Sequence, residues 1–488
     1  MVGKVFLPLP RLMENMTIEE ALNNTPLNAK RKIKQINTAI RISPLLFLGF
    51  VFSLCSLKAT AADSLKHQIL SLDSAISMGL QHSKQVQYSN ARLSESKSSL
   101  SDLDNRIMPD LDVSAGYSRL SNIPTEYINF PGFPPIPSTA LFPVILNNYS
   151  AGASLSESVF NGFQWKYAVQ NMQFAEKSAE FSLESQKANV SIMVIMEYIN
   201  LYKLQQAYEV VQENMKEINA HVDEVNDFVK HGLATQNDLL RTQLQYSNAQ
   251  LTELDIKNQI QTLNFNLNTL LGLPENITIA VDSNAILTSK SSQPLPYYLQ
   301  NYTQNRNDLK AADMQTKAAE SGIEETKSGL YPKLTIGADY NYLRPNPRIV
   351  PPLDQFQPTW DIGFRISYSI TGLYDNKSKT DITRAKYAET KAQYDDLSDN
   401  AKMDINKDYL QYKESLDKIG VAQKSLEQAI ENYKIVKSKY DNHIALLTDL
   451  LDADSFLLNA KINLISSKAD ATLAYYSMLK SAGVFTTK

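Results

Sequence analysis

Two aspartates near the C-terminal end of the chain have the spacing of a paired acidic site. Asp449 and Asp452 lie in the stretch SKYDNHIALLTDLLDADSF, which begins at Ser438. Helical residues three apart share one face, so both carboxylates can point into one space. Acids at the start of a helix also complement its dipole. The pair is therefore a candidate for a shared acidic site or simply for a helix start.

The same order of signals occurs earlier, in FVKHGLATQNDLLRTQ. Asp-Leu-Leu follows a turn in both stretches, at Asp238 and at Asp449, and Gly232 and His443 each stand six positions before it. Glycine at a turn permits a positive φ or a close backbone approach. Asp238 fits an N-cap or first-turn acid. The first copy has Arg241 where the second has its second acid.

The sequence gives no support for catalysis. The five histidines are His67, His82, His221, His231 and His443. They do not follow the spacing of a metal site. No phosphate-binding loop, nucleophile elbow or dinucleotide fingerprint is present. We predict no enzyme, no catalytic residue, no metal site and no cofactor. His443, beside acids, is either a pH sensor or a tolerated turn residue.

The first 61 residues have the features of a secretory signal peptide. A basic region precedes the apolar run Ile42–Leu57, and the small-x-small site Ala59-Thr60-Ala61 follows it. The run is too short for a membrane-spanning helix. It holds Cys55, the one cysteine of the chain. The exported protein therefore has no thiol chemistry.

The exported part is acidic and lacks a long apolar run. Residues 62–488 carry 40 Lys and Arg against 49 Asp and Glu, a net charge near −9. This charge argues against a nucleic-acid partner. No later run reaches the roughly 18 apolar residues that a spanning helix needs. If this protein enters a membrane, we expect it to do so as strands.

Two internal repeats organise the exported part. Pro109 corresponds to Pro332, and Gly162 corresponds to Gly372. Each repeat begins with two predicted strands, and the clearest alternation lies in Thr359–Ser369. Its apolar positions are Trp360, Ile362, Phe364, Ile366 and Tyr368, and its polar positions are Asp361, Gly363, Arg365 and Ser367. Period two over about ten residues, with aromatics on the apolar face, is typical of a membrane β-barrel strand.

Long helices follow the strands. Phe163–Lys230 and Leu373–Asp441 contain no proline, and apolar residues in the second recur every three to five positions. This spacing predicts long amphipathic helices of coiled-coil type. Shorter returning helices are expected over Asn237–Leu271 and Leu447–Ala482. Four strands leave two open edges in a membrane, so several copies must join to close a barrel.

The order of the motifs resembles the TolC family of outer-membrane efflux factors. The resemblance rests on NRNDLKAADMQTKAAESGIEETKSGLYPKL from Asn305, IMPDL from Ile107, LLGLP from Leu270 and the two turn-Asp-Leu-Leu segments. It implies a mixed α+β membrane protein whose four strands per chain join a trimeric twelve-stranded outer-membrane barrel. A long periplasmic α-helical coiled-coil barrel would complete the fold.

The resemblance also assigns roles at the tips of the helices. Asp449 and Asp452 match the pore-constricting acids, and in a homotrimer they would form a ring of six carboxylates that attracts cations. Tyr440 matches the tip tyrosine, although it also fits a helix-packing aromatic. Asp238 matches an acid of the first tip. The sequence departs from the family at His443, where a glycine is expected, and at Ala445, where a basic residue is expected.

These patterns predict the following division. We expect a signal peptide (1–61), a helical segment (62–108), a first β-hairpin (109–160), a first helical hairpin (161–272), a linker (273–300), a helix (301–331), a second β-hairpin (332–372), a second helical hairpin (373–482) and a tail (483–488).

The resemblance implies an exit duct of a tripartite efflux or type I secretion system, working with a periplasmic adaptor and an RND or ABC pump. The alternative is an exported coiled-coil structural or adaptor protein without a pore. The sequence leaves the cargo open among small molecules, metals and proteins.

Overall fold

The computed structural model describes most of the chain after the expected signal peptide. The described residues are 67–121, 127–128, 139–140, 144–282 and 291–485. The expected signal peptide, residues 1–61, lies outside them, as do the last three residues of the expected tail. Among the described residues, no helix combines the length and apolarity needed to cross a bilayer.

Four strands form one antiparallel sheet with the order β2-β5-β7-β8. They are β2 (Asp110–Arg119), β5 (Asn147–Phe160), β7 (Lys333–Arg344) and β8 (Gln357–Ser367). Register places Tyr340 opposite Trp360 and Ile336 opposite Phe364, so the apolar positions share one face. Within this sheet β2 and β8 are the edges, and each pairs with a neighbour on one side alone.

The apolar face of the sheet is bare in the single chain. Trp360, Ile362, Phe364 and Ile366 are 73%, 69%, 74% and 65% exposed. The opposite face carries a row of polar residues that pair in register across the strands: Asp112, Ser154, Asp339 and Asp361. A contiguous exposed apolar face of this kind marks a surface that another partner or a membrane covers.

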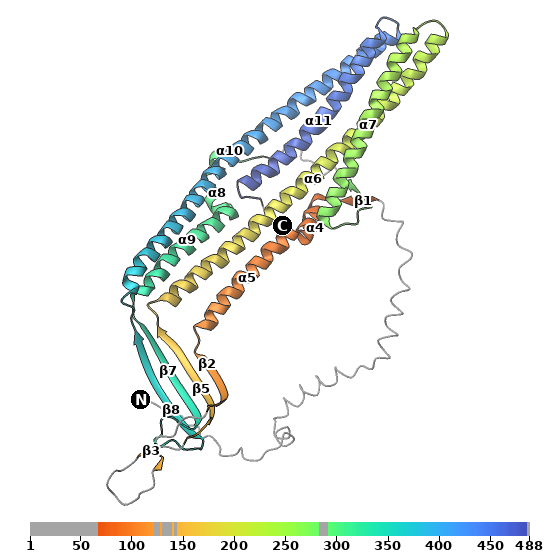
Figure 1. Cartoon of the computed structure of the whole chain (residues 1–488). Coiled ribbons are helices and arrows are strands. Elements are labelled where there is room, and N and C mark those ends of the chain that lie inside the picture. The colour runs from red at the N-terminus through yellow and green to blue at the C-terminus, as the bar shows by residue number, and fades with distance from the viewer. Residues whose placement is uncertain (1–66, 122–126, 129–138, 141–143, 283–290, 486–488) are drawn as a thin grey trace, which may run out of the picture. The chain divides into compact units, whose positions relative to one another are not determined.

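Two long helical hairpins extend from the sheet (Figure 1). The first consists of α6 (Gln164–Lys230) and α7 (Gln236–Leu271), and the second of α10 (Gly372–Asp441) and α11 (Leu447–Ser481). The 67 residues of α6 span roughly 100 Å at 1.5 Å per residue. These bounds lie within one residue of the expected helices, because long proline-free amphipathic runs carry a strong periodic signal.

Shorter helices run beside the long ones between the sheet and the middle of the helical part (Figure 1). They are α4 (Leu72–His82), α5 (Lys84–Arg106), α8 (Leu295–Asn305), α9 (Asn307–Lys327) and the 3-10 turn η2 (Ser328–Leu330). Helix α5 packs on α6, α6 on α9, and α9 on α10, while α11 packs on both α10 and α6. The amide of Asn376 on α10 donates to the Thr326 carbonyl at 2.8 Å, which caps α9 where the helices meet the strands.

A small parallel sheet in the middle of the helical part was not expected. It pairs β1 (His67–Leu70) with β6 (Thr278–Val281) inside the expected helical segment 62–108 and the expected linker 273–300. The hydroxyl of Tyr198 on α6 donates to the Leu70 carbonyl at 2.6 Å and accepts from the Asp282 amide at 3.1 Å. This buried tyrosine therefore links both strands to the long helix.

The expected helix 301–331 also differs in the structure. Helix α8 already begins at Leu295, where prolines on either side favour a helix start, and Arg306 interrupts the helix with an extended backbone. The Arg306 guanidinium bonds Asp308 at 2.6 Å and the Ser481 carbonyl at 3.1 Å. Arg306, at the break between α8 and α9, thereby holds the C-terminal end of α11. The remaining described strands, β3 (Tyr127–Ile128) and β4 (Thr139–Ala140), form a two-residue ladder in the first loop.

Candidate functional site

The two hairpins end in turns of the same geometry. After α6, the Gly232 amide donates to the Val229 carbonyl at 3.1 Å and the Leu233 amide to the Phe228 carbonyl at 2.8 Å. After α10, the His443 and Ile444 amides make the equivalent bonds, both at 2.8 Å. This is the Schellman arrangement, which needs a left-handed residue at its centre.

Gly232 provides that residue with φ of 69°, as the sequence predicts. A Cβ built on Gly232 would have no atom within 4 Å, so the glycine is needed for conformation and not for space. At the second tip His443 adopts φ of 59°. Its exposed ring lies edge-on to Phe228 of the first hairpin, with 5.9 Å between the ring centres. The histidine thus takes a conformation that costs a side-chain residue about 1–2 kcal/mol.

Asp238 closes a capping box at the start of α7. Its carboxylate accepts from the Thr235 amide at 3.0 Å and from the Thr235 hydroxyl at 2.7 Å. Its own amide donates to the Thr235 hydroxyl at 3.2 Å. These bonds from Thr235, with Arg241 nearby, lower the pKa of the Asp238 carboxyl below its ordinary value. Asp238 is therefore anionic at neutral pH and fixed at the helix start.

Asp449 takes the corresponding position in α11. Its carboxylate accepts from the Leu446 amide at 3.1 Å. Leu446 has no side-chain oxygen that could accept a hydrogen bond from the Asp449 amide. The second helix start therefore has one of the two hydrogen bonds of a capping box. Asp452 is exposed on the next turn of α11 and forms no hydrogen bond or ion pair within the described part of the chain. Both acids are exposed in the single chain.

A cavity of about 350 Å³ lies between the two tips. Its lining includes Asp238, Arg241, Tyr440, His443 and Ala445. Below it, Val225, Leu239 and Leu447 form a small apolar cluster that joins the hairpins. Burial, with the charges of Glu224, Asp238 and Asp441, raises the pKa of Tyr440 to about 12. The phenol therefore keeps its proton and can act as a hydrogen-bond donor in this cavity.

The structure thus brings together three of the six residues that the sequence singled out. Asp238, Tyr440 and His443 line the cavity, while Gly232 shapes the neighbouring turn. Asp449 and Asp452 are not part of its lining. Sequence reasoning missed Arg241 as a lining residue. Arg241 places a positive charge in the lining of this cavity. Ala445, at the position where the family has a basic residue, lines the same cavity and carries no charge.

A buried acid was also missed. Asp454 on α11 is 1% exposed and accepts a hydrogen bond of 2.7 Å from the Asn214 amide of α6. The signal was present, because Leu450, Asp454 and Leu457 follow the i, i+4, i+7 spacing of a core-facing stripe. In the described residues, no group of three or more His, Cys, Asp or Glu is arranged to hold a metal ion.

Comparison with known proteins agrees with this architecture. The family described as Outer membrane efflux protein matches residues 75–273 and 298–484. The outer membrane protein TolC of Vibrio cholerae serotype O1 is 20% identical over 383 residues, which cover 77% of this chain and 82% of that protein.

Solved structures show the same fold. The outer membrane protein VceC from Vibrio cholerae aligns with a TM-score of 0.70 at 19% identity, over 84% of this chain and 96% of that chain. The CmeC outer membrane channel of Campylobacter jejuni aligns with a TM-score of 0.69 at 16% identity, over 85% of this chain and 86% of that chain. Because the family match covers both helical hairpins and most of the chain, this protein belongs to the outer membrane efflux protein family, the TolC family of outer-membrane channels.

Proposed function

We propose that this protein is the passive exit duct of a tripartite efflux or type I secretion system. Substrates would pass from a periplasmic adaptor and an inner-membrane pump of RND or ABC type, through the helical part, and out across the outer membrane. The chain itself would perform no chemistry on them. Energy and most of the substrate selectivity would come from the pump.

The exposed apolar face of the four-stranded sheet is the observation that carries this proposal. Trp360 and Phe364 are more than two-thirds exposed, and no part of the described chain covers them. In water such a face would be a liability, whereas in lipid it is the required surface of a barrel strand. An envelope coiled-coil protein without a pore has no need of this face.

The two sheet edges support assembly from several copies. In lipid, each unpaired backbone group costs several kcal/mol, so β2 and β8 need partners. If β8 of one copy pairs with β2 of the next, three copies give a closed barrel of twelve strands. We infer a homotrimer, with the helical hairpins of the three chains enclosing one tunnel.

The tips then form the closable end of this tunnel. Asp449 and Asp452 are exposed in the single chain, which is a condition for lining a shared lumen. Three copies would bring six carboxylates into a narrow constriction that favours cations. Gly232, His443, Tyr440 and Asp238 would shape and latch the tip, with Arg241 as the neighbouring cation in place of a basic residue at Ala445.

A matched pair of lysine substitutions on the two faces of the sheet tests the barrel. Phe364→Lys places a charge on the apolar face and is expected to cost roughly 2–4 kcal/mol of insertion free energy at mid-membrane depth. Ser154→Lys places the same charge on the opposite face, in register with Asp112 and Asp339, and is expected to be tolerated.

The measurement is the folded trimeric fraction after transfer from urea into lipid vesicles, together with single-channel conductance. Phe364→Lys should lower both, while Ser154→Lys should retain insertion and conduct. Equal behaviour of the two variants, or a wild-type protein that stays a soluble monomer without conductance, would favour the pore-less alternative.

A further inference from the structure

A polar layer interrupts the apolar packing between the two hairpins, some way back from the tips. Towards the tips lies the apolar cluster of Val225, Leu239 and Leu447, and on the other side lies a cluster around Val211 and Ile256. Between these two clusters α6, α10 and α11 contribute four polar residues: Asn214, His221, Tyr433 and Asp454. We call them the Asp454 cluster.

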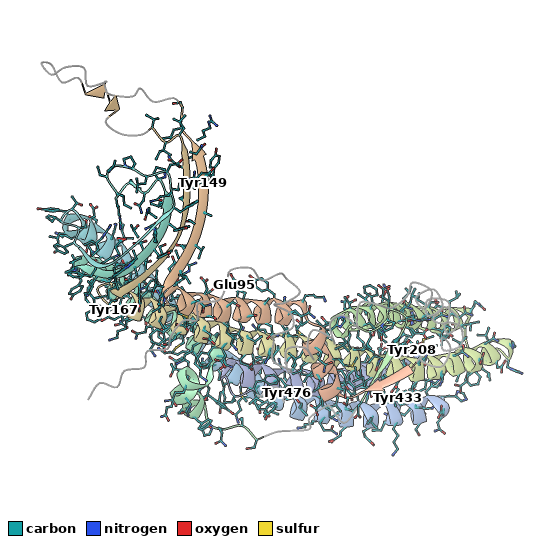
Figure 2. All side chains as sticks on the ribbon, turned by 90° about the horizontal axis from the view of Figure 1, so that it is seen from below. Glu95, Tyr149, Tyr167, Tyr208, Tyr433 and Tyr476 are labelled. Atoms are coloured by element: carbon teal, nitrogen blue, oxygen red, sulfur yellow. The ribbon has the colours of Figure 1, made fainter. Side chains whose placement is uncertain are left out.

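The Asp454 cluster holds three of the five buried side-chain atoms without a hydrogen-bond partner in the described residues. They are the second carboxylate oxygen of Asp454, Nε2 of His221 and the hydroxyl of Tyr433. Asp454 and His221 are 1% and 6% exposed. Tyr433 is labelled in Figure 2 and packs beside Leu457, one turn from Asp454. Unpartnered buried polar atoms are rare in folded proteins, and each destabilises the fold.

The cluster lacks hydrogen-bond donors. Asn214 already donates to one oxygen of Asp454, at 2.7 Å. Nδ1 of His221 lies 3.6 Å from the Glu224 carboxylate, which favours a hydrogen on Nδ1 and leaves Nε2 as an acceptor. Nε2 of His221 and the second oxygen of Asp454 are therefore buried acceptors without a donor, and the Tyr433 hydroxyl bonds neither of them. A proton on the second oxygen of Asp454 would remove the buried negative charge that this oxygen shares.

Burial favours a proton on Asp454. Burial raises its pKa; the Asn214 hydrogen bond opposes this, and the negative charge of Glu217 on α6 raises the pKa further. The charges of His221 and Lys461 lower the pKa of Asp454. The Lys461 ammonium also lies 3.7 Å from the Glu213 carboxylate. On α10, burial with the charges of Glu217, Asp454 and Asp441 raises the pKa of Tyr433 to about 12, so this hydroxyl stays protonated.

We propose that the Asp454 cluster is a proton-binding site that sets how firmly the second hairpin is held against the first. With the proton bound, Asp454 is neutral and α11 packs tightly on α6. When the proton leaves for solvent, a negative charge remains between the helices beside Glu217, and the packing of α11 on α6 loosens. The site belongs to the packing of one chain and does not depend on conduction.

The sign of the pH dependence follows from the direction in which the pKa of Asp454 is shifted. A carboxyl whose folded-state pKa is raised stabilises the fold fully below its ordinary pKa, near pH 4. That stabilisation is lost as the pH rises through the raised value. The helix interface is therefore tighter in acid than at alkaline pH.

Hydrogen exchange of the full-length protein in detergent tests this proposal. Amide protection in residues 447–465 is compared at about pH 4 and about pH 8, after correction for the intrinsic exchange rate. In the wild type we expect protection to fall severalfold towards the higher pH, because the stabilisation that comes with a raised carboxyl pKa is present in acid and lost as the pH rises. Asp454→Asn cannot ionise, so its protection should be equal at both pH values. Asp454→Leu provides a second unchargeable variant that fits the apolar stripe.

Glu431→Gln is the matched control, because it removes an exposed acid of α10 two residues from Tyr433. It should retain the wild-type pH dependence. The proposal is overturned if wild-type protection is the same at both pH values, if both Asp454 variants keep the dependence, or if Glu431→Gln abolishes it.

Discussion

Gly232 and His443 hold the same left-handed backbone conformation at equivalent positions of the two tip turns. Glycine adopts this conformation freely, whereas histidine does so at a cost. The second tip is therefore the more strained of the two, and it is the tip that leads into the acids of α11. The strain sits in the backbone, because both turns make the same pair of capping hydrogen bonds.

Replacing His443 with glycine should stabilise the second tip. We expect the free energy of local opening at the end of α10 to rise by about 1 kcal/mol, seen as roughly fivefold slower hydrogen exchange of the His443 and Ile444 amides. Gly232→Ala is the reverse experiment. The Cβ that alanine adds at position 232 meets no atom within 4 Å. A loss of local stability of similar size would therefore come from the backbone conformation and not from a steric clash. Unchanged exchange in both variants would contradict this account.

Breaking the capping box should loosen the start of α7. Thr235→Ala removes the hydroxyl that bonds Asp238, and such caps contribute about 1 kcal/mol. The lowered pKa of Asp238 adds a pH dependence: its stabilisation is present above the ordinary carboxyl pKa and is lost as the pH falls through the lowered value. Limited proteolysis after residue 230 at neutral and acid pH measures both effects. If the wild type were as resistant in acid as at neutral pH, the role of the Asp238 carboxylate would be refuted.

Removing both tip acids should change ion selectivity. We expect Asp449→Ala with Asp452→Ala to weaken block by divalent cations and reduce cation preference in bilayer recordings, because the proposed ring of six carboxylates disappears. The matched control is Asp395→Ala with Asp396→Ala, which removes two exposed acids from α10. Selectivity that is unchanged in the first variant, or changed equally in both, would leave Asp449 and Asp452 as ordinary helix-start acids.

Much of the fold was predictable because its signals are local and repeated. The alternation from Trp360 to Ile366 predicts β8, and the proline-free amphipathic run before Lys230 predicts α6 almost to the residue. Strands β1 and β6 carry no such signal. Each has four residues, and their pairing depends on a distant tyrosine, Tyr198, that bonds the backbone at both.

The tip was predictable in part. The repeated Asp-Leu-Leu correctly marks the starts of α7 and α11, where Asp238 and Asp449 bond the preceding backbone. The sequence could not show that Arg241 shares a cavity with Tyr440, because that contact joins two hairpins far apart in the chain. The sequence could not show that Asp454 is buried, because an acid among apolar residues can also lie at the exposed edge of the helix face. Its burial depends on the packing of α11 against α6.

The open edges of the sheet have a consequence for how the protein acquires its stability. In the barrel that we propose, the β2 and β8 edges gain partners and the apolar face gains lipid, so a chain alone does not reach its lowest free energy. Folding would then be subject to mass action: dilution or loss of lipid would favour the incomplete state, and neighbouring copies would favour the assembled one. The concentration of copies at the membrane would then determine stability together with the contacts within one copy.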